Sequence, residues 1–233
     1  MKIPQHLQKD HATGAIEGQA VAQFEIGNYK NFVYLALDWA TKKAAIIDPQ
    51  RDLSLPLGVI KKHGFELTAI FLTHSHFDHT AGVGELIRLY PQIPVMIHQD
   101  ELHRLDKSIV NHGQIKTIHD GDSFAIGALR LQTLHTPGHS AGECCFLMEG
   151  APPDLYLFTG DTLFIRDCGR TDIESGSNEQ MFHSLQRLKK LPSNAIVLPG
   201  HHYRSECTST LEVEFRESPP FQCKSVTELA NLP

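Results

Sequence analysis

The chain has 233 residues, of which 41% are hydrophobic and 21% are charged. This balance is typical of a folded globular domain and excludes a disordered or fibrous protein. The length excludes a modular assembly of many domains. Acidic residues number 27 against 21 basic residues, which gives a formal net charge of −6 with neutral histidine. Because there is no basic excess, we expect neither nucleic acid nor an anionic membrane as the main partner.

We predict one domain over residues 1–233, with residues 1–18 as a loose N-terminal segment. No apolar run approaches the roughly 18–20 residues of a membrane-spanning helix, and the first residues lack the apolar core of a secretory signal. The five cysteines are an odd number without framework spacing, which favours reduced thiols and a cytoplasmic protein. Two of them, Cys144 and Cys145, should point to opposite faces if their segment is a strand.

Short apolar runs alternate with amphipathic stretches along the chain, a pattern typical of an α/β fold. The runs predict strands over 31–38, 43–48, 67–73, 93–98, 123–136, 142–148, 155–160 and 195–200. Helical spacing predicts helices over 56–63, 80–90, 179–191 and 225–232. Gly64 is placed to end the first helix, and Met181, Leu185 and Leu188 share one face of the third.

Fifteen histidines against one tryptophan is an excess that needs a reason, and several of them follow strands directly. The polar groups that follow predicted strands are His74-Ser75-His76-Phe77-Asp78-His79, then His139, Asp161 and His201. Loops at strand ends can gather residues that are distant in sequence at one edge of a sheet. We therefore expect these side chains to meet.

The spacing of the first group has its own geometry. In an extended segment His74 and His76 point the same way, and a following helical turn lets Asp78 and His79 return toward a second position. Imidazole and carboxylate donors at this density suit Zn, Fe or Mn. The seven donors exceed the needs of one tetrahedral ion and suffice for two metals about 3.5–4 Å apart that share a carboxylate. Packing so many ionisable groups together without a cation would be costly.

These motifs, together with Thr136-Pro137-Gly138-His139, Thr159-Gly160-Asp161-Thr162 and Pro199-Gly200-His201, resemble the metallo-β-lactamase superfamily. The resemblance covers about residues 30–205. It implies an α/β fold of the αββα type, a sandwich of two mixed β-sheets flanked by helices with metals at one edge. It also implies a first metal at His74, His76 and His139, a second at Asp78, His79 and His201, and Asp161 bridging the two.

Two branches of the superfamily compete. The segments 174–176, 179–181, 184–185, 191–192 and 200–203 look like glyoxalase II, a hydroxyacylglutathione thioester hydrolase. That enzyme carries a long C-terminal helical region, whereas only 31 residues follow His202 here. The segments 48–52 and 168–172 look like persulfide dioxygenases, which use one Fe(II) at the positions of His74, His139 and Asp161. This chain departs from them at Phe77 and His202.

The two branches predict different chemistry on a shared class of substrate. In the first, which we favour, two divalent ions, zinc foremost, provide a metal-bound hydroxide that Asp78 orients toward the thioester carbonyl. In the second, one Fe(II) oxidises glutathione persulfide. Both branches handle small glutathione-derived substrates, and the resemblance implies that Arg170 and Tyr203 contact them. It also makes a homodimer conceivable. A catalytically silent binding protein would lack a donor, and none is missing.

Overall fold

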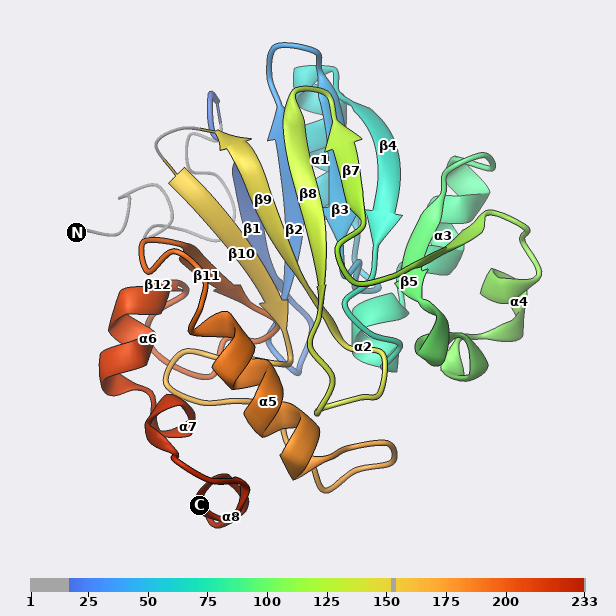
Figure 1. Ribbon diagram of the computed structural model, residues 1–233. Helices are drawn as coiled ribbons and strands as arrows, with labels where there is room; N and C mark the ends of the chain where they lie inside the picture. The colour runs from blue at the N-terminus through green and yellow to red at the C-terminus, as the bar shows by residue number, and fades with distance from the viewer. Residues whose placement is uncertain (1–16, 152–153, 233) are drawn as a thin grey trace.

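The strands of the computed structural model form two sheets that pack face to face (Figure 1). The model describes residues 17–151 and 154–232. Most of the N-terminal segment that we expect to be loose, residues 1–16, therefore lies outside the described residues. The strands are β1 (Val21–Ile26), β2 (Asn31–Asp38), β3 (Lys43–Ile47), β4 (Glu66–Phe71), β5 (Val95–His98), β6 (Ile115–Ile118), β7 (Ser123–Ile126), β8 (Leu129–His135), β9 (Cys144–Ala151), β10 (Asp154–Gly160), β11 (Ile196–Pro199) and β12 (Ser209–Thr210).

Helices connect and cover these strands. They are α1 (Ser54–His63), α2 (Phe77–Thr80), α3 (Val83–Leu89), the 3₁₀ helix η2 (Gln99–Arg104), α4 (Lys107–Val110), α5 (Asn178–Leu188), α6 (Leu211–Glu217), α7 (Pro219–Gln222) and α8 (Val226–Ala230). Gly64 ends α1 in the left-handed region at φ 68°, as predicted. The predicted face of α5, formed by Met181, Leu185 and Leu188, is fully buried.

Both sheets mix parallel and antiparallel neighbours. The first has the order β1-β2-β3-β4-β5-β6, with its first two pairs antiparallel and its last three pairs parallel. The second has the order β12-β11-β10-β9-β8-β7, in which only β10 and β11 run parallel. Such connectivity places the ends of β4, β8, β10 and β11 at the same edge, the lower one in Figure 1.

Three apolar layers hold the sheets and helices together. Aromatic rings fill the space between the sheets, where Phe71 meets Phe146 with centroids 5.4 Å apart and Tyr34 meets Phe158 at 5.2 Å. Helices α1 and α3 cover the outer face of the first sheet, and α5, α7 and α8 cover that of the second. The order of layers confirms the predicted αββα sandwich.

Two predicted elements are wrong in extent. The stretch 123–136 forms two strands, β7 and β8, because Gly127 takes a left-handed φ of 62° and turns the chain into a hairpin. The stretch 80–90 contains only α3 and the end of α2, since the chain leaves helical geometry between Thr80 and Val83. Strands β1, β6 and β12 and helices η2, α4, α6 and α7 were not predicted, most of them being short.

The two adjacent cysteines point to opposite faces of β9, as predicted. Cys144 faces the core between the sheets, and Cys145 faces the layer beneath α5. No disulfide joins cysteines within the described residues. Among the helices described, none has the length and apolar character needed to cross a bilayer.

Candidate metal centre

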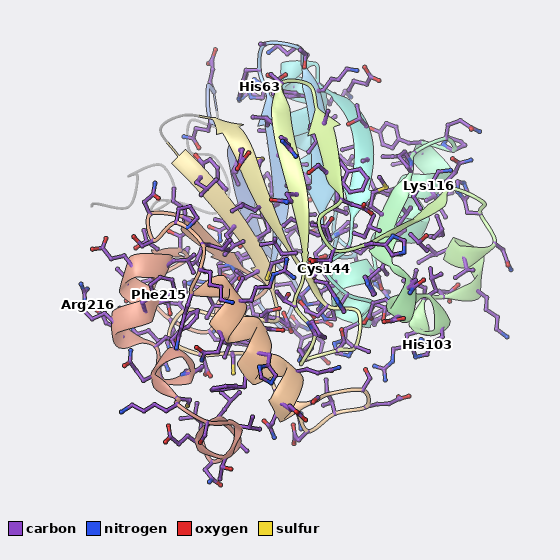
Figure 2. The ribbon with its side chains drawn as sticks, viewed as in Figure 1. His63, His103, Lys116, Cys144, Phe215 and Arg216 are labelled. Atoms are coloured by element: carbon purple, nitrogen blue, oxygen red, sulfur yellow. The ribbon has the colours of Figure 1, made fainter. Side chains whose placement is uncertain are left out.

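The seven candidate donors meet at one end of the sandwich. His74, His76, Asp78 and His79 follow β4, with α2 beginning directly after His76, so the predicted extended-then-helical geometry is present. The loops after β8, β10 and β11 bring the other donors, which are His139, Asp161 and His201. Figure 2 labels Cys144, which opens β9 at this lower end, and shows the crowded side chains around it.

The donors form two trios. Ring nitrogens of His74, His76 and His139 lie within 4.8 Å of one another, and Nε2 of His139 is 2.9 Å from Nδ1 of His76. Ligand atoms of Asp78, His79 and His201 lie within the same limit, with the two Nε2 atoms of the imidazoles 3.1 Å apart. These are the two sets that the resemblance implies.

Asp161 lies between the trios. Its Oδ2 is 3.4 Å from Nε2 of His139 on one side and 3.4 Å from Nε2 of His201 on the other. Its Oδ1 is 3.5 Å from Nε2 of His79. One carboxylate therefore faces both sets, which is the position that a bridging ligand requires.

Hydrogen-bond acceptors on the protein contact Nδ1 of four of the imidazole rings and so orient them. Nδ1 of His79 is 3.0 Å from Oδ2 of Asp48, and Nδ1 of His74 is 3.0 Å from the hydroxyl of Thr73. Backbone carbonyls do the same for two more rings: Arg170 O is 2.8 Å from Nδ1 of His139, and Tyr29 O is 2.8 Å from Nδ1 of His201. An acceptor at Nδ1 leaves the lone pair on Nε2, which is the tautomer that binds a metal through Nε2.

Two buried polar atoms in the cluster have no hydrogen-bond partner. They are Nε2 of His74 and Oδ1 of Asp161, both enclosed and both facing the other donors. Leaving such atoms unpaired inside a protein costs free energy comparable to a lost hydrogen bond. A divalent cation would satisfy both, so the residues present fit a metal.

Electrostatic coupling within the cluster is strong. Burial lowers the pKa of His79, but the carboxylates of Asp161, Asp48 and Asp78 outweigh it and raise that pKa to about 9. Burial, and then His79, hold the pKa of His74 well below its ordinary value. Burial acts to raise the pKa of Asp161, yet His79 and other nearby imidazoles keep it well below the usual range. Positive charge is therefore favoured between these carboxylates, as a cation site requires.

The two residues expected to contact substrate lie in different situations. Tyr203 is exposed, and its ring stacks on that of His201 with centroids 4.8 Å apart. Burial and the carboxylates of Asp161 and Asp78 raise the pKa of Tyr203 to about 12, so its hydroxyl remains a donor at neutral pH. The exposed Arg170 guanidinium binds Asp172 through two nitrogens at 2.7 and 2.9 Å. Arg170 must release Asp172 before it can bind a substrate carboxylate.

Sequence reasoning missed two acidic residues at the site. Asp48 accepts from Thr73 and pairs with His79, and it follows a strand just as the donors do, which is a usable signal. Glu143 is fully buried beside His74, with no pattern in the sequence to mark it. A further group, His98, Asp100 and His135, meets the distance limit. Its two rings stack at 4.2 Å and 6°, so their in-plane lone pairs do not converge on one ion.

With this geometry in place, comparison with known proteins identifies the family. A protein-family model described as the metallo-β-lactamase superfamily matches residues 28–201. The chain belongs to the metallo-β-lactamase superfamily. This superfamily enzyme superposes on the solved structure of ETHE1 from Myxococcus xanthus with a TM-score of 0.78 and 30% identity, covering 91% of this chain and 92% of that one.

Curated relatives from both predicted branches match this superfamily member. It is 36% identical to the hydroxyacylglutathione hydrolase of Gloeobacter violaceus over 74% of this chain and 64% of that enzyme, so it spans less than two thirds of that relative. It is 34% identical to the mitochondrial persulfide dioxygenase of Bos taurus over 87% of this chain and 78% of that enzyme. A probable zinc-dependent hydrolase of polyketide biosynthesis from Bacillus velezensis is 30% identical, over 88% of this chain and 87% of that one. The predicted superfamily is confirmed, and both of the predicted branches are represented among the relatives.

Proposed function

We propose that this superfamily enzyme hydrolyses a thioester with two divalent metal ions, and that its substrate is an acylglutathione. The observation that carries the proposal is the pair of donor trios on either side of Asp161. Seven converging donors exceed the needs of one ion, whereas two ions sharing a carboxylate account for all of them. The relative named hydroxyacylglutathione hydrolase supports the substrate class.

In this proposal the first ion is held by His74, His76 and His139, and the second by Asp78, His79 and His201, with Asp161 bridging. Zinc is the favoured metal, since imidazole and carboxylate ligands suit it and one relative is named as zinc-dependent. When bound, the ions supply Lewis acidity toward the carbonyl oxygen and a water whose pKa is lowered toward neutrality.

Asp78 is the residue that orients the attacking water. Its Oδ2 accepts a hydrogen bond from Nδ2 of Asn31 at 2.9 Å and lies 3.5 Å from Nε2 of His201. These contacts fix a partly exposed carboxylate at the mouth of the second trio, where it can accept a proton of the water. The leaving thiol has an ordinary pKa of about 8.5, so the thiolate departs without a dedicated acid.

Arg170 and Tyr203 bind the polar glutathione portion in this proposal. The guanidinium group of Arg170 binds the Asp172 carboxylate through two nitrogens, and the same geometry suits a carboxylate of glutathione. The protonated Tyr203 hydroxyl donates a hydrogen bond next to the second trio.

A second candidate is the oxidation of a glutathione persulfide by one Fe(II) at His74, His139 and Asp161. The relative named persulfide dioxygenase supports it, since that enzyme is 34% identical over 87% of this chain. His76, Asp78, His79 and His201 would then act as hydrogen-bonding neighbours of the iron site.

Metal analysis of anaerobically purified protein distinguishes the two, together with assays of S-lactoylglutathione hydrolysis and of oxygen uptake with glutathione persulfide. Two zinc ions per chain with thioester cleavage support hydrolysis, whereas one iron with oxygen uptake supports oxidation. His79→Ala and His76→Ala should abolish hydrolysis. His63→Ala is the matched control, because His63 lies at the opposite end of the sandwich (Figure 2) and should leave the rate unchanged. Full activity of His79→Ala would rule out the two-metal route.

A further inference from the structure

One buried carboxyl group contacts two of the candidate donors at once. Glu143 immediately precedes β9 and has no exposed surface. Its Oε2 lies 3.2 Å from Nδ1 of His74, and its Oε1 accepts the backbone N–H of Asp161 at 2.9 Å. His74 follows β4 of the first sheet and Asp161 follows β10 of the second, so the Glu143 side chain connects donors that come from the two sheets.

The hydrogen bonds around Thr73 determine which nitrogen of His74 carries the proton. The hydroxyl hydrogen of Thr73 is donated to Oδ2 of Asp48 at 2.7 Å. The Thr73 oxygen therefore presents a lone pair to Nδ1 of His74, 3.0 Å away. Nδ1 must be the protonated nitrogen, and Oε2 of Glu143 lies 3.2 Å from it, in contact but outside hydrogen-bond geometry.

The backbone is shaped to let Glu143 approach. Gly160, directly before Asp161, has a φ of 47°, and a Cβ there would lie 2.4 Å from Oε1 of Glu143 and 2.7 Å from the hydroxyl oxygen of Thr73. Any larger residue at position 160 would separate the carboxyl group from the Asp161 amide.

We propose that Glu143 is a positioning residue of the metal centre: its Oε1 holds the Asp161 backbone in place, and its Oε2 packs against Nδ1 of His74, behind the nitrogen that faces the metal. The unpartnered Nε2 of His74 is the atom that this arrangement presents to the ion. The inference rests on the proposed metal centre and adds a buried carboxyl group behind His74 and Asp161 that the resemblance did not imply. Outer partners of this kind contribute about 10–100-fold to metal affinity.

Glu143→Gln tests the proposal with almost no change in shape. An amide has one acceptor and one donor end, so an amide that accepts from the Asp161 N–H turns its NH₂ group toward Nδ1 of His74. With Oε1 on Asp161, the amide hydrogens face Nδ1 and favour the tautomer that carries its proton on Nε2. We expect zinc affinity, measured by competition with a chromophoric chelator, to fall about 10–100-fold. The melting temperature of the protein in excess chelator should not fall.

Glu214→Gln is the matched control. Glu214 is also fully buried, its Oε2 accepts the backbone N–H of Arg166 at 2.7 Å, and its Oε1 has no partner. No contact in the described part of the chain joins it to the seven donors, so its replacement should leave zinc affinity within about threefold of wild type. Unchanged zinc affinity in Glu143→Gln would overturn the inference, as would an equal loss in Glu214→Gln. A wild-type chain without zinc affinity would refute the metal centre itself.

Nitrogen-15 NMR of the wild-type chain supplies a readout that needs no folded variant. Long-range proton–nitrogen correlations, with His74 assigned by comparison with His74→Gln, should show a proton on Nδ1 and none on Nε2, both in chelator and with zinc. A proton on Nε2 of His74 in the metal-free protein would contradict the proposed role of Glu143.

Discussion

Gly138→Ala should destabilise the protein because it forces the His139 loop away from α5. Gly138 has a φ of 148°, and a Cβ there would lie 2.4–2.6 Å from N, Cα and Cβ of Met181. The two segments are also joined by the Ser177 N–H, which donates to Gly138 O at 2.8 Å. Backbone atoms of a buried helical turn cannot move aside as a flexible side chain can.

The destabilisation by Gly138→Ala is the sum of two free-energy costs. A side chain in this region of φ costs about 1–3 kcal/mol, and overpacking against a fixed neighbour costs about 1–3 kcal/mol more. A total of about 2–6 kcal/mol lowers the melting temperature of a chain of this size by about 4–24 °C. Calorimetry of the protein in excess chelator measures this without any contribution from metal.

Gly58→Ala is the control for the same chemical change. Gly58 lies within α1, and a Cβ there would meet nothing within 4 Å. This substitution should stabilise the protein by about 0.4–1 kcal/mol, because alanine favours the helix and restricts the unfolded chain. A melting temperature of Gly138→Ala equal to that of wild type would show that the loop and α5 do not constrain each other as described.

Four further outcomes are expected. The pKa of His79, about 9 in the metal-free fold against 6.5 ordinarily, means that its stabilisation is complete below pH 6.5 and is lost as the pH rises through 9. Urea unfolding in chelator should show a loss of up to about 3 kcal/mol over this window, which His79→Asn should remove. Asp161→Asn should lower the bound metal measured by elemental analysis to one ion or fewer, whereas retention of two would exclude bridging. Arg170→Ala should raise KM severalfold at unchanged metal content, and an unchanged KM would remove Arg170 from the substrate site. Burial raises the pKa values of Cys145 and Cys168 to about 12. Ellman's reagent at pH 8 should therefore label these two thiols about 10³-fold more slowly in the native protein than in the unfolded protein. Equal labelling rates in the two states would contradict the burial of these thiols.

Much of the fold and most of the candidate donor set could be predicted from local patterns. A nearly continuous apolar run marks the fully buried strand over 31–38, and a period of 3.6 residues marks the apolar face of α5. The seven donors are visible for a related reason: each follows an apolar strand, and sheet topology brings such ends to one edge. The hairpin between β7 and β8 was missed because Gly127 lies in an otherwise continuous apolar run.

The sequence alone determined most of the elements, the layered fold class and the identity of the candidate donors. Only the tertiary structure decided how those donors are held. The carbonyl oxygens of Tyr29 and Arg170 orient two imidazoles, and a backbone carbonyl carries no residue-specific signal. Glu143 meets His74 because two sheets pack at a particular register, and that contact joins positions 69 apart in the chain. Local periodicity encodes which face a side chain occupies, whereas the partner it meets there depends on the packing of elements that are remote in sequence.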